Sequence, residues 1–186
     1  MSQERFILTV VGKDHPGIVA GIASTLYEYG CNIHELNQTV LSDEFAMILL
    51  LQPTRDINIK DLDESLKKRC DKLEVTHSLR TAVVISASAE QPSKDILIIT
   101  VIGSDKIGII AGVADVLANM NINIVELSAK PFVVHNQAQY AVVARVEIGN
   151  EVDIFSLNKA LEDCARNLSV EIKVQNQDIF KAMHEI

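Results

Sequence analysis

The segment Gly12–Val19 (GKDHPGIV) returns 91 positions later as Gly103–Ile110 (GSDKIGII). A glycine, an aspartate, a second glycine and an isoleucine keep their spacing in both copies. The repeat extends beyond this segment: Ile7–Leu36 aligns with Ile98–Leu127 without a gap, and about half of the paired residues are identical. A repeat of this kind indicates a duplicated structural unit. The chain is therefore interpreted as two copies of one domain.

The offset of the repeat changes beyond this window. After a four-residue insertion around Pro131–Gln137 it becomes 95, so that Phe45 matches Tyr140. A unit of about 90 residues is too long for a solenoid repeat and has the size of a small domain. We expect a first domain over residues 1–85, a small, polar linker over 86–94, and a second domain over 95–186 that ends in a short tail.

Each copy has the hydrophobic pattern strand, helix, strand, strand, helix, strand. Ile18, Ile22 and Leu26 recur at helical spacing in the first helix. Pro16 is expected in the first turn of this helix and Gly30 at its left-handed stop. The strands of the first copy are expected over Phe6–Val11, Ile33–Leu41, Phe45–Leu51 and Leu73–Ile85, with a polar connection Ser42–Glu44 between the middle two.

This order of elements predicts an α+β fold. Two right-handed βαβ crossovers give a ferredoxin-like βαββαβ domain, a four-stranded antiparallel sheet with both helices on one face. The strand Phe45–Leu51 is almost continuously apolar, so both of its faces are expected to be buried. We therefore expect the sheets to associate through faces or edges, with the other copy or as a homodimer.

Composition limits the function. The chain is 48% hydrophobic and 23% charged, which suffices for packed cores, and its formal net charge of −8 disfavours direct binding to nucleic acid. The basic triplet Lys67–Arg69 stands among acidic residues and is interpreted as part of a solvated helix. Apolar runs are too short to span a bilayer, and the N-terminus has no signal-type segment. Three isolated cysteines (Cys31, Cys70, Cys164) fit a reducing cytoplasm, and Cys31 is expected to be a buried thiol.

The repeated segments carry a family likeness. Gly12–Val19, followed by Gly30–Ile33 (GCNI), resembles the signature of ACT domains, a G-x-D-x-P-G-I turn into the first helix and G-x-N-I into the second strand. The second copy matches less completely, because Ile107 stands in the place of the proline and Asn121 in the place of the later glycine. A tandem pair of this length is similar to the glycine cleavage system transcriptional repressor group.

The resemblance implies a function. ACT domains bind amino acids or similar small ligands where two domains meet, between the strand-one/helix-one loop of one domain and the start of strand two of its neighbour. They control associated proteins and usually carry no catalysis or cofactor. The residues that match are Asp14, His15, Pro16, Gly17, Ile18, Asn32 and Ile33 in the first copy, and Asp105, Lys106, Gly108, Ile109, Asn123 and Ile124 in the second.

The chemistry of these residues permits such a role. Open N–H groups at a helix N-terminus can bind a ligand carboxylate, and Asp14 can pair with its ammonium group. Gly17 allows close approach, and Asn32 offers a donor and an acceptor. Structural alternatives stay open. Asp14 could complement the helix dipole or cap the turn, which is worth about 0.5–2 kcal/mol, Gly17 could serve helix–sheet packing, and Asn32 could be a turn residue.

A histidine in the first loop and a glutamate in the second strand of each copy also allow two interpretations. His15 is accessible to a ligand or is simply a solvated loop histidine, and Lys106 replaces it in the second copy. Glu35 and its counterpart Glu126 face a partner or solvent, with a structural role favoured. The longer connection Lys130–Gln137 is expected to cover or block either its own site or that of its neighbour. Unequal affinities are therefore expected, with the first loop binding better.

Three function classes follow. The favoured one is a non-catalytic regulator that binds a glycine- or serine-like amino acid and acts on a transcription factor or enzyme partner. The second is an interaction module without a ligand. The third is a small enzyme that uses His15 with Asp14. No HxH or HExxH spacing, phosphate-binding loop or G-x-S-x-G motif is present, so neither a metal site nor an enzyme is expected.

Overall fold

The computed structural model describes residues 4–82, 95–134 and 136–177. The chain divides into two compact units, Met1–Ser86 and Ala87–Ile186. The expected linker over 86–94 lies outside the described residues.

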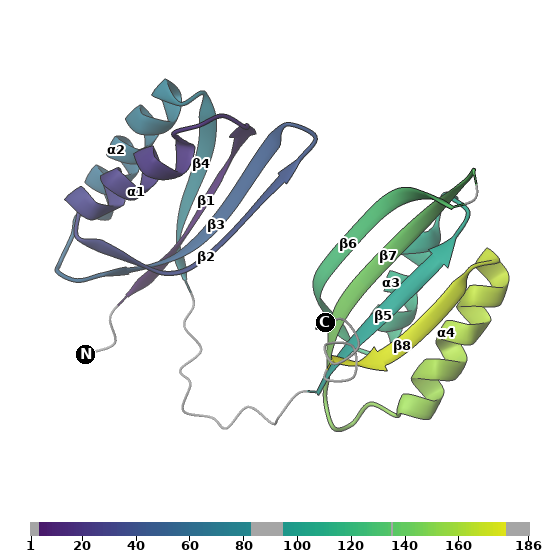
Figure 1. The fold of residues 1–186 in the computed structure, drawn as a ribbon. Helices are drawn as coiled ribbons and strands as arrows, with labels where there is room; N and C mark the ends of the chain where they lie inside the picture. The colour runs from purple at the N-terminus through teal and green to yellow at the C-terminus, as the bar shows by residue number, and fades with distance from the viewer. Residues whose placement is uncertain (1–3, 83–94, 135, 178–186) are drawn as a thin grey trace. The chain divides into compact units, whose positions relative to one another are not determined.

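The first unit is a four-stranded antiparallel sheet in the order β2-β3-β1-β4, with both helices on one face (Figure 1). The predicted ferredoxin-like fold is confirmed. Its elements are β1 (Arg5–Lys13), α1 (Ile18–Glu28), β2 (Cys31–Leu41), β3 (Glu44–Pro53), α2 (Ile59–Lys72) and β4 (Val75–Ala82).

The second unit repeats this topology with the strand order β6-β7-β5-β8. Its elements are β5 (Asp95–Gly103), α3 (Ile109–Asn119), β6 (Asn123–Val134), β7 (Gln137–Ile148), α4 (Ile154–Leu168) and β8 (Glu171–Asn176). The duplication seen in the sequence is therefore a duplication of the whole fold.

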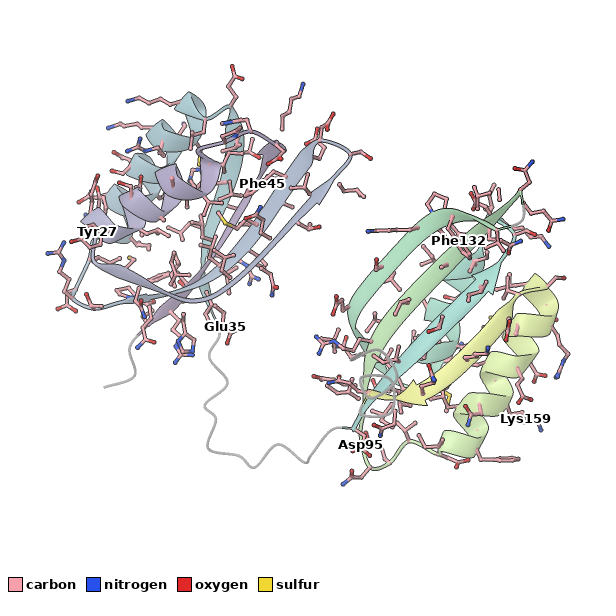
Figure 2. The ribbon with its side chains drawn as sticks, in the orientation of Figure 1. Tyr27, Glu35, Phe45, Asp95, Phe132 and Lys159 are labelled. Atoms are coloured by element: carbon pink, nitrogen blue, oxygen red, sulfur yellow. The ribbon has the colours of Figure 1, made fainter. Side chains whose placement is uncertain are left out.

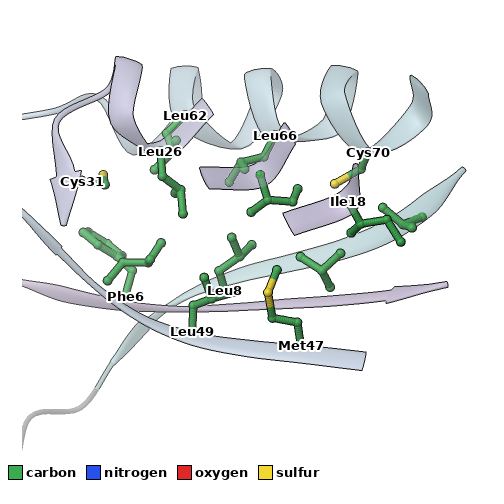
Figure 3. Packing of buried hydrophobic residues seen from close by; sticks show 14 of the residues in the cluster. Phe6, Leu8, Ile18, Leu26, Cys31, Met47, Leu49, Leu62, Leu66 and Cys70 are labelled. Atoms are coloured by element: carbon green, nitrogen blue, oxygen red, sulfur yellow. The ribbon is translucent and has the colours of Figure 1, made fainter. Parts of the chain in front are cut away.

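The core of the first unit lies between the sheet and the two helices. Alternate residues of β1 point toward the helices, since side chains on a strand alternate between its faces. Leu8 and Leu66 are fully buried there and face each other across the layer (Figure 3). Burial of one such leucine contributes about 1.5–3 kcal/mol. The matching core residues of the second unit are Ile99 and Leu161.

The face of the sheet away from the helices is not covered within the unit. On β3, Phe45, Met47 and Leu49 are buried, whereas Ile48 between them is 45% exposed. One face of β3 is thus covered by the helices, and the other is bare within the domain, as expected for a sheet with both helices on one side. Association through this face or through the strand edges stays a prediction.

Several boundaries differ from those expected. Helix α1 begins at Ile18 after Gly17, so Pro16 lies in the preceding turn and not in the first helical turn. The β2–β3 connection is a two-residue turn, Ser42-Asp43, with positive φ at both residues, which matches the twist of the paired strands. Gly30 has φ 68°, as expected of a left-handed stop.

The insertion in the second copy lengthens a hairpin. Pro131 belongs to β6 and is paired with Tyr140 of β7, and the pairing continues to Val134 opposite Gln137. The residues on both sides of the connection take part in strand pairing, and the expectation that it covers a ligand site stays a prediction.

Candidate functional site

The first candidate loop joins β1 to α1. The backbone N–H of Asp14 donates to the carbonyl oxygen of Asp43 in the β2–β3 turn (2.7 Å), so the loop is tied to the hairpin beside it. The Asp14 side chain is exposed and makes no hydrogen bond or ion pair with any described residue. Its carboxylate is therefore available to a ligand.

Gly17 ends this loop in the left-handed region, with φ 105°. A Cβ atom at Gly17 would meet nothing within 4 Å, so the packing alternative for this glycine is wrong and its backbone conformation accounts for it. The first helical hydrogen bond runs from the N–H of Gly21 to the carbonyl of Gly17 (2.8 Å). No side chain caps α1, so the capping alternative for Asp14 is also wrong, whereas its alternative role beside the helix dipole stays open.

The second loop repeats this geometry. Gly108 has φ 98° with open space around it, Asp105 is exposed, and no side chain caps α3. Of the four helices with described bounds, the other two differ: Asn58 accepts a hydrogen bond from the N–H of Lys60 at the start of α2, and Asp153 caps α4. The two helix starts without a side-chain cap are thus the two that follow the duplicated loops.

His15 is held in place. Its Nε2 lies 2.7 Å from the carbonyl oxygen of Leu73, and its Nδ1 lies 3.0 Å from that of Pro16. The hydrogen bond to Leu73, then that to Pro16, and then the charges of Glu74 and Asp14 raise the pKa of the imidazole above its ordinary value. His15 stays partly exposed to solvent while both of its ring nitrogens contact carbonyl oxygens of its own domain, and its contact with a ligand stays a prediction.

The remaining loop residues divide by exposure. The side chains of Ile18 and Ile109 are 1% and 2% exposed and belong to the cores, so only their backbones can reach a ligand. Pro16 and Lys106 are exposed, and Ile107 is fully exposed. The second loop therefore presents an apolar side chain and a lysine where the first presents proline and a hydrogen-bonded histidine.

The residues expected from the second strand lie far from the loop of their own domain. Asn32 and Ile33 belong to β2, and the partner of Ile33, Leu51, is paired on its other side with Phe6 near the start of β1. The loop follows Lys13 at the other end of β1. At about 3.3 Å per residue along β1, the start of β2 and the β1–α1 loop are roughly 23 Å apart. A single domain thus does not bring them together.

The second unit shows the same separation. Ile124 is paired with Val146, which is paired with Leu97 near the start of β5, whereas the loop follows Gly103. Asn123 also lies in a strand, opposite Glu147. In the first unit Asn32 is extended and paired with Gln52, so the alternative of a turn residue is wrong for Asn32.

A β-bulge follows these positions in both copies. The register shifts between Ile33 and Glu35 in β2, and at the matching residues of β6. Glu35 then projects from β2 away from both helices (Figure 2). Its counterpart Glu126 lies 3.3 Å from Arg145, in agreement with the structural role favoured for this glutamate. The bulge and the partners of the loop, Asp43 and Leu73, were not expected from the sequence.

Over residues 4–82, 95–134 and 136–177, no three His, Cys, Asp or Glu side chains are grouped to hold a metal ion, and no helix is long and apolar enough to cross a bilayer. The prediction of a buried thiol at Cys31 is confirmed, and Cys70 and Cys164 are buried as well. Burial raises the pKa of Cys70 to about 11 and shifts those of Cys31 and Cys164 upward.

Comparison with protein families matches the two copies separately. The ACT domain model matches residues 4–80 and 95–175. The chain belongs to the ACT domain family. The predicted tandem ACT architecture is thereby confirmed, and both candidate loops lie inside the matched segments.

The curated relatives of this ACT protein are the size of one of its domains. A UPF0237 protein of Methanopyrus kandleri is 46% identical over 72 residues, which are 38% of this chain and 80% of that protein. A UPF0237 protein of Methanocaldococcus jannaschii is 41% identical over 91 residues, 48% of this chain and 97% of the relative.

Two solved structures share the complete tandem ACT fold. A protein of unknown function from Galdieria sulphuraria has a TM-score of 0.79 at 23% identity, covering 94% of this chain and 99% of the other. A protein described as a candidate glycine cleavage system transcriptional repressor has a TM-score of 0.67 at 19% identity, covering 94% and 98%. At these identities the likeness concerns the fold.

Proposed function

We propose that this tandem ACT protein is a non-catalytic regulator that binds a small, glycine- or serine-like amino acid at its ACT loops and modulates a partner protein. ACT domains are regulatory modules that typically bind amino acids. The observation that carries the proposal is the pair of uncapped helix starts, each beside an exposed aspartate without a partner among the described residues.

The loop offers complementary groups for both ends of an amino acid. The first N–H groups of a helix have no intrahelical acceptor and favour an anion, here the ligand α-carboxylate. Asp14 offers a charge-assisted hydrogen bond to the α-ammonium group. The open space at Gly17 accommodates the ligand close to the backbone. The side chain of Ile18 is buried in the core, so at this position the ligand would meet only the backbone.

A complete site requires a second ACT domain. Since Asn32 and Ile33 lie roughly 23 Å from the loop of their own domain, a neighbouring domain has to supply the start of its second strand. We therefore expect ligand binding to favour association between domains, including a homodimer through ACT sheets. Regulation then follows from the ligand's preference for the associated state.

The partner is expected to be a protein. A chain with a formal net charge of −8 repels phosphate backbones, so an effect on transcription requires a transcription factor, and an effect on metabolism an enzyme. The structural neighbour described as a candidate glycine cleavage system transcriptional repressor supports a role in the control of amino-acid metabolism.

Titration calorimetry against the proteinogenic amino acids at millimolar concentration tests the proposal. We expect heat with a small amino acid, loss of the tighter site in Asp14→Asn and of the weaker site in Asp105→Asn. Asp56→Asn, which also removes an exposed carboxylate, is the matched control and should bind normally. Absence of heat across the whole panel would overturn the sensor.

An interaction module without a ligand is the second candidate. Leu36, Val40 and Leu41 on the edge strand β2 are 41%, 47% and 70% exposed, which favours a contact with another sheet. This alternative predicts association that no amino acid changes. Analytical ultracentrifugation with and without the amino acid found by calorimetry measures the association state. A change on addition of the amino acid favours the regulator, and no change favours the interaction module.

A further inference from the structure

We propose that His15, protonated on both ring nitrogens, latches the first candidate loop to the C-terminal end of α2 and makes this loop, but not the second, respond to pH. The consequence for ligand binding rests on the proposed function. The latch itself is a property of the protein without ligand.

The geometry around the ring requires two donors. Both atoms that face the imidazole are carbonyl oxygens, that of Leu73 at 2.7 Å from Nε2 and that of Pro16 at 3.0 Å from Nδ1. A carbonyl oxygen can only accept, and a neutral imidazole has only one N–H. The imidazolium satisfies both contacts, whereas the neutral ring places a lone pair against one of the oxygens.

The anchor of the latch is the end of a helix. Leu73 is the C-cap of α2, and its own N–H donates to the carbonyls of Arg69 and Cys70. The last carbonyls of a helix favour a nearby cation. The side chain of Leu73 packs closely on α1, since a Cβ at Gly21 would lie 2.9 Å from its Cδ1. His15 therefore connects the loop to the contact between the two helices.

The charges around the ring favour its cationic form. The charged groups that act on it are the carboxylates of Asp14, in its own loop, and Glu74, in the turn between α2 and β4. They add to the two hydrogen bonds in raising the pKa of His15. A raised pKa means that the stabilising contact is complete below the ordinary histidine range and is lost as pH rises through the raised value.

The second copy has no such device. Lys106 replaces His15, is exposed and makes no hydrogen bond or ion pair with any residue of the described segments. Lysine keeps its charge throughout the neutral range. The two loops can thus be compared within one chain, and only the first is expected to change its conformation with pH.

The loss of the latch leaves the loop partly anchored. The hydrogen bond from the N–H of Asp14 to the carbonyl of Asp43 does not depend on a titrating group. We therefore expect the loop to loosen at higher pH, with the fold intact. A looser loop no longer holds Asp14 and the first N–H groups of α1 in one arrangement.

Nuclear magnetic resonance of the full chain without ligand tests the latch. We expect both ring nitrogens of His15 to be protonated at pH 6, with a titration midpoint above that of an unstructured histidine. The carbonyl carbon shift of Leu73 should move with the same midpoint, and the exchange rate of the Asp14 amide, corrected for intrinsic pH dependence, should rise with it. The Asp105 amide should show no such step.

Variants separate the latch from ordinary titration. In His15→Lys the Leu73 carbonyl shift should become flat across this range, and in His77→Gln, a control at a histidine paired with Asp63, the step should persist. A single protonated ring nitrogen at pH 6, or a Leu73 shift that does not follow His15, would overturn the latch.

Ligand binding is measured separately with glycine and L-serine as probes at pH 6 and pH 8.5. If the latch controls the loop, affinity at the first site should be lower at pH 8.5 than at pH 6 in the wild type and should be equal at both pH values in His15→Lys. Affinity that is equal at both pH values would overturn the coupling of the latch to binding. Absence of binding to every amino acid would overturn the proposed sensor, while the measurements without ligand would still decide the latch.

Discussion

The carboxylate of Glu126 lies 3.3 Å from Nε of Arg145, directly opposite it across β6 and β7. In the first domain Glu35 keeps the glutamate, but the residue opposite is Leu50. The ion pair is therefore a feature of one copy, added to a shared backbone.

This pair is expected to contribute little to stability. Arg145 is 36% exposed and Glu126 69%, and solvent screens such pairs to about 0–1 kcal/mol. A double-mutant cycle of Glu126→Gln and Arg145→Leu, measured by urea unfolding, should give a coupling energy within about 1 kcal/mol. A much larger coupling would show that the pair is buried in the associated protein, and measurement at two protein concentrations distinguishes that case.

Replacement of Gly12 by alanine should destabilise the first domain. A Cβ at Gly12 would lie 2.8 Å from Cγ1 and 2.9 Å from Cα of Val75, so β1 and β4 would have to move apart. We expect a loss of about 1–3 kcal/mol in the free energy of unfolding. Gly149→Ala is the control, because its nearest neighbour is the flexible end of Glu151. Equal losses in the two variants would contradict the packing argument.

Asp153 and Asp14 should behave differently on truncation. Asp153 accepts hydrogen bonds from the N–H groups of Phe155 and Ser156, whereas Asp14 caps nothing. Asp153→Ala should lower the midpoint of thermal unfolding at pH 7, and Asp14→Ala should leave it in place. A comparable loss from Asp14→Ala would restore a structural role for that aspartate.

The contribution of Asp153 should also depend on pH. Its hydrogen bonds with Ser156, and then that with Phe155, lower its pKa. A lowered pKa means that the stabilisation is present at neutral pH and disappears as pH falls through the lowered value. The difference in melting midpoint between wild type and Asp153→Ala should therefore shrink in acid.

The thiols should be inert in the native protein. Burial raises the pKa of Cys70 to about 11 and moves those of Cys31 and Cys164 in the same direction, so little thiolate is present at pH 8. We expect iodoacetamide to leave all three unmodified in the folded chain and to alkylate all three in denaturant. Mass spectrometry of the intact protein reads out both states, and rapid native alkylation would contradict the burial.

The fold was predictable because the residues that make it are duplicated. Core positions such as Leu26 and Leu117 recur at the same offset as the turn glycines, so pattern and repeat agree. The position of each boundary was harder to predict. Proline is favoured in a first helical turn, but the left-handed conformation of Gly17 places Pro16 before the helix.

The candidate site was predictable only in part. The loop residues are contiguous in sequence and form one structural segment. The partner of His15 is a backbone carbonyl 58 residues away, and a carbonyl carries no sequence signal. Asn32 was correctly placed near the start of a strand, but its distance from Asp14 depends on strand register, which hydrophobic pattern alone does not give for a mostly exposed edge strand.

The separation of Asp14 from Asn32 within one domain affects how such a protein would measure its ligand. Under the proposed function each domain contributes its loop to one site and the start of its second strand to another. Two domains related by a two-fold axis therefore complete two sites at once. When those domains belong to different chains, occupancy depends on the concentration of the protein as well as that of the amino acid. The dose at which the response begins would then shift with expression level, and synthesis of the protein would itself set the sensitivity of the sensor.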